Sequence, residues 1–209
     1  METERLRIFD DDRNPIGVAT REEAHKLGYW HEVFHCWVVS REDGIDFVYL
    51  QLRSDLKKDY PGLFDITAAG HLLENERVED GIREVEEEIG LKISFEELLP
   101  LGIIAYHVVN GNLIDKEIAN IFLYRTKITL DDFVLQEEEV AGIVKVAFTD
   151  FMALWLDEIG MIKISGFKLD DMGGRILIDE YVGKNSFVPH QTKFYQEIIQ
   201  RIKQVIEER

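Results

Sequence analysis

The sequence predicts an α+β fold in which a few helices pack on a mixed sheet. Three pairs of segments rich in aromatic and β-branched residues flank short turns, which is the pattern of β-hairpins. A segment between the first two hairpins and another at the end of the chain carry apolar residues at helical spacing. Because no Pro/Gly/Ser-rich linker or internal repeat divides the 209 residues, no clean domain boundary is expected.

The expected strands begin with residues 6–9, which precede a turn at 11–15. The three hairpins join 34–39 to 47–52, 101–109 to 113–124, and 161–169 to 175–181. Their turns contain Glu42-Asp43-Gly44, Asn110-Gly111-Asn112 and Asp170-Asp171-Met172-Gly173-Gly174, whose Asn and Gly residues tolerate positive φ. One further strand is expected over residues 142–148.

Helices are expected over residues 78–89, 150–158 and 191–209, and residues 21–27 form a short helix or a loop. Gly90 follows the first of these as a C-terminal cap. In the last helix, Tyr195, Ile198, Ile202 and Ile206 recur at helical spacing, so one face should pack on the body of the protein.

Composition excludes several classes of function. The 24 Lys and Arg residues against 41 Asp and Glu give a formal charge of −17, which disfavours nucleic acid and anionic membrane surfaces as partners. No apolar run approaches the roughly 18 residues of a membrane span, and the charged start does not resemble a signal peptide. A single Cys36, set in an apolar strand, offers neither an internal disulfide nor a metal cage and is expected to be inert. We therefore expect a cytoplasmic protein.

Three acids of the first predicted helix are candidates for metal binding. Glu84, Glu87 and Glu88 share about 100° of a helix face that adjoins the apolar stripe. Carboxylates at this spacing repel one another, and oxygen ligands on a rigid face suit Mg²⁺ or Mn²⁺. The alternative is a solvated acidic face.

The stretch GHLLENERVEDGIREVEEEIGL, from Gly70 to Leu91, resembles the signature of the Nudix (MutT-like) hydrolases. That signature reads G-x5-E-x7-R-E-U-x-E-E-x-G-U, where U is a bulky apolar residue. The second half, from Arg83 onward, fits at every position. Only six residues separate Glu76 from Arg83 where the family has seven. This shorter spacing leaves open whether Glu76 keeps its usual pairing with Arg83.

The resemblance implies a Nudix-type α/β/α sandwich over residues 1–158 and a divalent metal ion held by Glu84, Glu87 and Glu88. Gly70 would let the backbone pass close to the helix, and Arg83 would hold the preceding loop in place by charge-assisted hydrogen bonds. In this family the residue that deprotonates water varies. We rank Glu87 first and Glu139 second, and the alternative for the 137–139 run is a solvated loop.

From about residue 5 to residue 158, the chain also resembles isopentenyl diphosphate isomerases, a branch of the same superfamily. That resemblance implies a second metal cluster made of His25, His31, His71, Asp115 and Glu117. Imidazole and carboxylate ligands together favour Mn²⁺ or Zn²⁺ over Mg²⁺. The alternative is that these are structural or surface residues.

Two departures from the isomerases favour hydrolysis. Their catalytic Cys is Ala69 here, and Ala transfers no proton, whereas Arg83 and all three acids of the hydrolase helix are present. Arg53, Lys57 and Lys58 precede the signature and are candidate phosphate contacts.

We therefore expect a Mg²⁺- or Mn²⁺-dependent hydrolase in which water attacks phosphorus in a small organic diphosphate. The alternatives are a diphosphate isomerase and a catalytically silent ligand-binding module. Nucleoside, sugar, prenyl and coenzyme diphosphates all remain open as substrates. Residues 159–209 form a C-terminal hairpin and helix on the same domain, which either cover the site or make a homodimer contact.

Overall fold

The computed structural model describes residues 4–111, 113–170 and 172–208, in which eleven strands form one mixed sheet. The strands are β1 (Arg5–Phe9), β2 (Pro15–Thr20), β3 (Trp30–Glu42), β4 (Ile45–Arg53), β5 (Phe64–Asp65), β6 (Ala68–His71), β7 (Leu99–Asn110), β8 (Leu113–Thr126), β9 (Val140–Ala147), β10 (Ile162–Leu169) and β11 (Arg175–Val182). The α-helices are α1 (Arg21–Leu27), α2 (Arg83–Ile89), α3 (Phe148–Trp155) and α4 (Thr192–Glu207). Short 3-10 helices are η1 (Val78–Ile82), η2 (Phe95–Glu97), η3 (Leu130–Asp132) and η4 (Lys184–Ser186). The predicted α+β class is confirmed.

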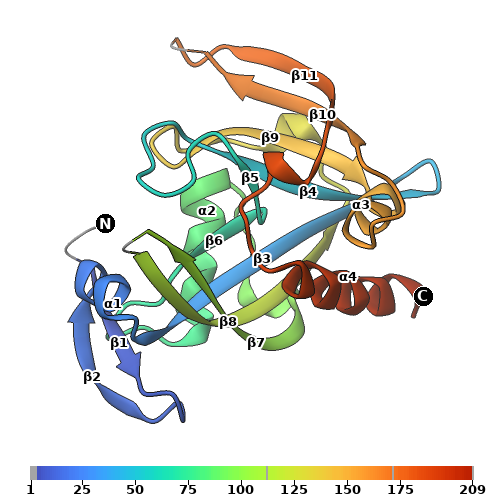
Figure 1. The fold of residues 1–209 in the computed structure, drawn as a ribbon. Coiled ribbons are helices and arrows are strands. Elements are labelled where there is room, and N and C mark those ends of the chain that lie inside the picture. Colours follow the sequence, from blue (N-terminus) through green and yellow to red (C-terminus); the bar gives the residue numbers. More distant parts are fainter. Residues whose placement is uncertain (1–3, 112, 171, 209) are drawn as a thin grey trace.

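Strand β3 lies at the centre of the sheet (Figure 1). Along one edge it runs parallel to β8 from Trp30, beside Lys116, to Ser40, beside Thr126. Along its other edge β3 pairs first with β1, then with β6 and then with β4, and all three run antiparallel to it. Because β4 and β6 occupy different stretches of one edge, their ends near the middle of β3 are held side by side.

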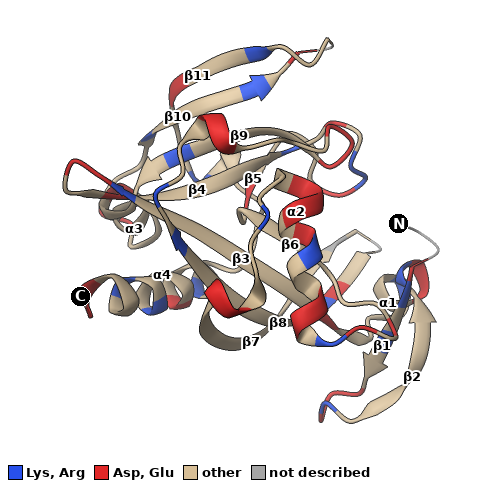
Figure 2. Ribbon diagram, turned by 180° about the vertical axis from the view of Figure 1, so that it is seen from behind, with Lys and Arg blue, Asp and Glu red and all other residues tan. Residues whose placement is uncertain are grey.

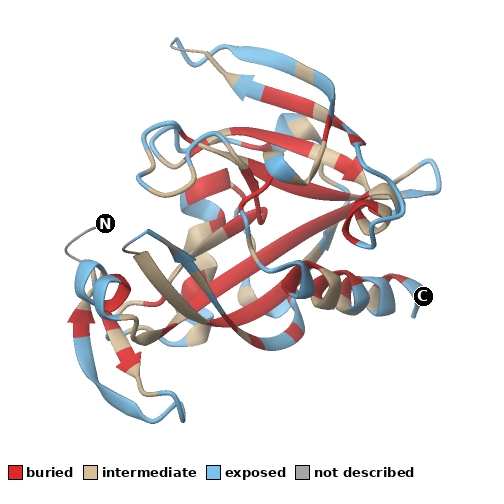
Figure 3. Cartoon of the chain, in the orientation of Figure 1, coloured by how far each residue is buried: buried red, intermediate tan, exposed pale blue. Residues whose placement is uncertain are grey.

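Most residues of β3 are buried, as Figure 3 shows. Successive side chains alternate between two apolar cores, because a strand points its side chains to opposite faces. Val33 and Trp37 join the core that α3 and α4 cover, whereas Phe34 and Cys36 join the core that contains Val85 of α2. The layers are therefore α/β/α, as the resemblance implied.

The three predicted hairpins are confirmed as β3–β4, β7–β8 and β10–β11. Asn112 and Asp171 of the expected turns, and Arg209 at the expected end of the last helix, lie outside the described residues. Strand β2 was not predicted, because Pro15 was interpreted as the end of a turn. Pro15 is instead the first residue of this strand at the edge of the sheet, where its missing N–H costs little.

The predicted helix over 78–89 is divided. A 3-10 turn, η1, precedes the α-helical part, α2. Gly81 of η1 lies so close to β3 that an added Cβ would stand 2.6 Å from the Phe34 Cβ. Gly90 caps α2 in the left-handed conformation, with φ at 75°, as predicted.

The C-terminal segment extends the same architecture. Strand β10 pairs with β9, and α4 buries an apolar face that includes Tyr195 and Ile198, as its spacing predicted. The division into 1–158 and 159–209 stays a prediction. Among the described residues, no helix is long and apolar enough to span a membrane.

Candidate functional site

A cavity of about 320 Å³ lies where β3, β4, β6 and α2 meet. Four groups of side chains line it: acids of α2, a His-carboxylate group, basic residues of the 53–57 segment, and residues near the C-terminus. Acidic residues cover much of α2 in Figure 2. The cavity brings together most of the residues that the sequence singled out.

Gly70 allows α2 to approach β6. An added Cβ at Gly70 would lie 2.1 Å from the Glu84 Cδ, a distance that no side chain can accommodate without displacing the carboxylate. The glycine of the signature is therefore needed for close approach, as predicted.

The three acids of α2 are not equivalent. Glu88 is only 4% exposed, and its Oε2 accepts hydrogen bonds from the Ala69 backbone N–H at 2.9 Å and the Gln51 amide at 3.2 Å. Burial, with a nearby carboxylate adding to it, raises the pKa of Glu88 to about 8. Burial likewise raises the pKa of Glu84 to about 7, whereas the Glu87 side chain is 54% exposed. Glu84 and Glu88 are thus not a solvated face, and they need a proton or a cation beside them.

Arg83 organises the loop and the helix face. Its guanidinium donates to both Glu76 oxygens at 2.6 and 3.2 Å, to Glu84 at 2.6 Å, to Glu87 at 3.1 Å and to the His71 carbonyl at 3.1 Å. The shorter spacing therefore does not break the Glu76–Arg83 pair. A 3-10 helix rises about 2.0 Å per residue against 1.5 Å for an α-helix, so η1 spans the distance with fewer residues.

The structure gathers the five residues of the second predicted cluster from α1, β3, β6 and β8. The Nε2 atoms of His25 and His31 lie 3.4 Å apart and are 3.5 and 3.3 Å, respectively, from Asp115 Oδ1. The parallel register of β3 and β8 places His31 beside Glu117. His71 completes a group of three imidazoles whose candidate ligand atoms lie within 4.8 Å of one another.

The chemistry of this cluster fits a cation. The His71 Nε2 atom is buried without a hydrogen-bond partner among the described residues, which is costly unless a ligand binds there. Burial lowers the pKa values of His25 and His71 and keeps the imidazoles in the neutral form that binds metals. At His31 burial acts in the same direction, but Asp115 outweighs it and raises the pKa.

Two of the three predicted phosphate contacts reach the cavity. Arg53 lines it, although its guanidinium also donates to the Asp65 carboxylate at 2.9 Å. Lys57 lines it too and forms an ion pair with Glu139, the second candidate base. Lys58 is exposed and is not part of the lining, so its phosphate contact stays a prediction.

Sequence reasoning gave no role to several polar residues that line the cavity, among them His35, Asp65, Tyr106 and His190. The His35 Nε2 atom lies 3.6 Å from Glu117, which also accepts a hydrogen bond from the Tyr106 hydroxyl. His35 follows His31 by four positions and lies on the same face of β3, so the alternation of side chains along a strand was a usable signal.

Ala69 and Cys36 differ in their relation to the cavity. Ala69 lines the cavity, so the position of the isomerase Cys faces the site here with only a methyl group. Cys36 is fully buried in the opposite core, and burial raises the pKa of its thiol to about 12. The expectation that it is inert agrees with this environment.

Comparison with known proteins identifies the family, although no protein-family model matches the chain. The chain is 38% identical over 203 residues to an uncharacterised Nudix hydrolase of Clostridium acetobutylicum, with 97% of this chain and 98% of the relative covered. The chain therefore belongs to the Nudix hydrolases.

More distant relatives have different names. An isopentenyl-diphosphate Δ-isomerase of Saccharopolyspora erythraea is 29% identical over 153 residues, covering 72% of this chain and 75% of the relative. The crystal structure of a MutT/nudix family protein from Enterococcus faecalis superposes with a TM-score of 0.55 at 14% identity, covering 84% of this chain and 62% of that chain. The structural likeness supports the Nudix fold alone.

Proposed function

We propose that the protein hydrolyses a small organic diphosphate in a reaction that depends on a divalent cation, with water attacking phosphorus. One observation carries this proposal: three acids of α2, the His71, Asp115 and Glu117 side chains of the His-carboxylate cluster, and the basic residues Arg53 and Lys57 line a single cavity. Such a cavity offers side chains that coordinate a cation and side chains that contact phosphate, all within reach of one bound diphosphate.

Two sets of residues would hold Mg²⁺ or Mn²⁺. Glu84, Glu87 and Glu88 offer oxygen ligands alone, whereas His25, His31, His71, Asp115 and Glu117 offer a mixed set. A cation bound there supplies charge neutralisation to the diphosphate and lowers the pKa of a water molecule. The buried His71 Nε2 atom, which has no hydrogen-bond partner among the described residues, supports the mixed set.

The protein's own groups bind the phosphates and accept the proton. Arg53 and Lys57 contact phosphate oxygens, and Lys57 exchanges its Glu139 partner for the substrate. Glu87 remains our first candidate for the base, since it is the most exposed of the three predicted metal ligands of α2 and lines the cavity. Glu139 is second, because its ion pair with Lys57 must open before it accepts a proton.

The similarity to isomerases makes isomerisation the second candidate. Tyr106 and Glu117 provide acid-base groups in the cavity, but Ala69 provides none at the position of the isomerase Cys. A silent binding module is less well supported, because such a module would not need the complete acidic set on α2.

A panel of nucleoside, sugar, prenyl and coenzyme diphosphates, each assayed for product formation with Mg²⁺ and with Mn²⁺, tests the proposal. We expect monophosphate products from at least one class and a rate about 10²-fold lower in Glu87→Gln. The exposed Glu86 of the same helix provides the control variant Glu86→Gln, which should retain full activity. Binding without turnover for every class would favour the silent module instead.

A further inference from the structure

The segment between η4 and α4 forms part of the cavity wall. Residues 187–190, here named the strap, pair with β5: the Val188 N–H donates to the Phe64 carbonyl at 2.9 Å, and Phe187 forms a parallel bridge with Phe64. Val188 and His190 both line the cavity. The strap thus lies beside residues that precede it by more than a hundred positions in the chain.

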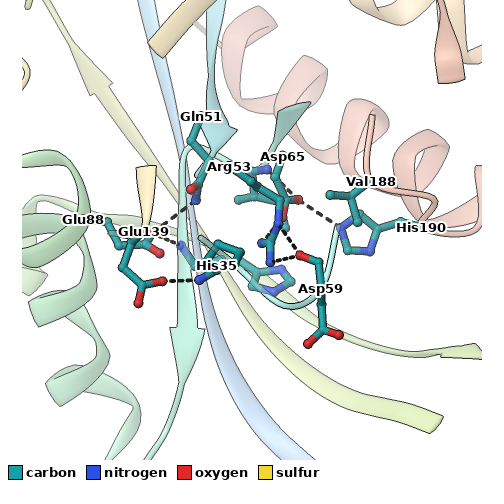
Figure 4. A network of polar contacts seen from close by, with 12 residues as sticks. His35, Gln51, Arg53, Asp59, Asp65, Glu88, Glu139, Val188 and His190 are labelled. Atoms are coloured by element: carbon teal, nitrogen blue, oxygen red, sulfur yellow. Dashed lines mark hydrogen bonds and ion pairs between the residues drawn. The ribbon is translucent and has the colours of Figure 1, made fainter. Parts of the chain in front are cut away.

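A chain of polar contacts joins the strap to Arg53 (Figure 4). The His190 Nε2 atom lies 3.1 Å from Asp65 Oδ1, which also accepts the Ile66 N–H at 2.9 Å. The other carboxylate oxygen, Oδ2, accepts from Arg53 Nη1 at 2.9 Å. Burial alone would favour protonation of Asp65, but His190 and Arg53 hold its pKa well below the usual range. Asp65 is therefore an ionised, buried link between the strap and the guanidinium.

The same contacts fix the plane of Arg53. Its Nε and Nη2 atoms donate to the Asp59 carbonyl at 3.1 and 2.7 Å, while Nη1 is held by Asp65. A guanidinium has five N–H groups in a rigid fork, so the two terminal nitrogens each keep one further N–H. Because the Arg53 side chain is 14% exposed and lines the cavity, these groups are available to an anion there.

We propose that His190 is a positioning residue: through Asp65, it orients Arg53 for the diphosphate, so that the C-terminal strap sets the affinity of the site for its substrate. The role of Arg53 as the phosphate contact rests on the function proposed above. The linkage from His190 through Asp65 to Arg53 does not, and it can be measured without substrate.

Steady-state kinetics on the best diphosphate of the panel test the proposal. His190→Phe keeps an aromatic ring but removes the donor, and it should raise KM about tenfold while kcat changes less than threefold. His190→Gln, whose amide can donate to Asp65, should recover most of the loss. The control is His107→Phe, because His107 is exposed on β7 and lies outside the cavity lining. In an Arg53→Gln background, His190→Phe should have no further effect on KM.

A second measurement separates this inference from the proposed function. The Nε–H resonance of Arg53, assigned by its loss in Arg53→Gln, should be sharp in the wild-type protein and in His107→Phe, and broadened by faster exchange in His190→Phe. An unchanged Arg53 resonance in His190→Phe overturns the proposal, and so does a KM effect that persists in full without Arg53. If His190→Phe fails to fold, His190→Asn, which is too short to reach Asp65, replaces it. A wild-type protein with no diphosphate turnover, but with the expected change in the resonance, would contradict the proposed function alone.

Discussion

Glu88→Gln separates the electrostatic cost of a buried carboxylate from its proposed use in cation binding. The substitution preserves size and leaves an oxygen that can accept the hydrogen bonds from Ala69 and Gln51. It removes only the charge and the ability to titrate. In the metal-free protein, the free energy of unfolding should therefore respond to pH differently in the variant and in the wild type.

The sign follows from the raised pKa. Glu88 titrates at about 8 in the folded protein against a reference value of 4.5, so between these pH values the folded state holds a proton that the unfolded state has lost. The stability that Glu88 contributes is complete below pH 4.5 and is lost as the pH rises to about 8. A difference of roughly 3.5 pKa units corresponds to an upper limit of about 5 kcal/mol. For a chain of this size, each kcal/mol of stability changes Tm by about 2–4 °C. Because partial relaxation of the site reduces the energy below its upper limit, we expect a shift in Tm of about 5–15 °C.

Thermal unfolding in a chelator at pH 5 and at pH 8 provides the assay. We expect Glu88→Gln to melt close to the wild type at pH 5 and about 5–15 °C above it at pH 8. Glu86→Gln is the matched control, because Glu86 is exposed on the same helix. Added Mn²⁺ should stabilise the wild type more than Glu88→Gln, and the variant should lose about 10²-fold in kcat. A difference in Tm between variant and wild type that is the same at both pH values would refute the raised pKa.

Three further predictions concern the loop, the His-carboxylate cluster and the reaction. In urea unfolding, Glu76→Ala and Arg83→Ala should each destabilise the protein, with a coupling of about 1–3 kcal/mol in the double-mutant cycle; simple additivity would mean that the pair contributes nothing. His71→Ala should leave the metal-free Tm nearly unchanged but reduce the stabilisation by Mn²⁺ measured by calorimetry, and equal stabilisation of both proteins would remove His71 from the ligand set. With isopentenyl diphosphate, any turnover should yield isopentenyl monophosphate and phosphate, since Ala69 provides no proton-transfer group; deuterium entering the allylic carbons from heavy water, detected by NMR, would instead indicate isomerisation.

The predictable part of the site is local in sequence. The acids of α2 follow Gly70 within one strand, loop and helix, so their spacing alone places them on one face. The hairpins were predictable for the same reason, because each depends on a turn and its two flanking segments. The closeness of His31 and Glu117, by contrast, depends on the parallel pairing of β3 with β8, and only the resemblance to isomerases implied it.

The remaining part depends on contacts between distant segments. His190 reaches Asp65 across 125 positions, and neither residue lies in a recognisable motif. The 3-10 winding of η1 also escaped prediction, because the apolar spacing of residues 78–89 fits an α-helix while the contact of Gly81 with Phe34 is tertiary. The continued pairing of Glu76 with Arg83 depends on that winding and could not be decided from the spacing alone.

The balance of charge at the cavity links cation binding to substrate binding. Nine Asp and Glu side chains line the cavity against four Lys and Arg, and Arg53 and Lys57 are already paired with acids. A diphosphate entering this cavity without a cation would add negative charge to an acidic site, which is unfavourable at short range and in a partly buried environment. Cation binding removes that repulsion, and by thermodynamic reciprocity the diphosphate must raise the affinity for the cation by the same factor. If the proposed function is correct, the apparent affinity for a diphosphate should therefore rise steeply with the concentration of Mg²⁺ or Mn²⁺, despite the net charge of −17.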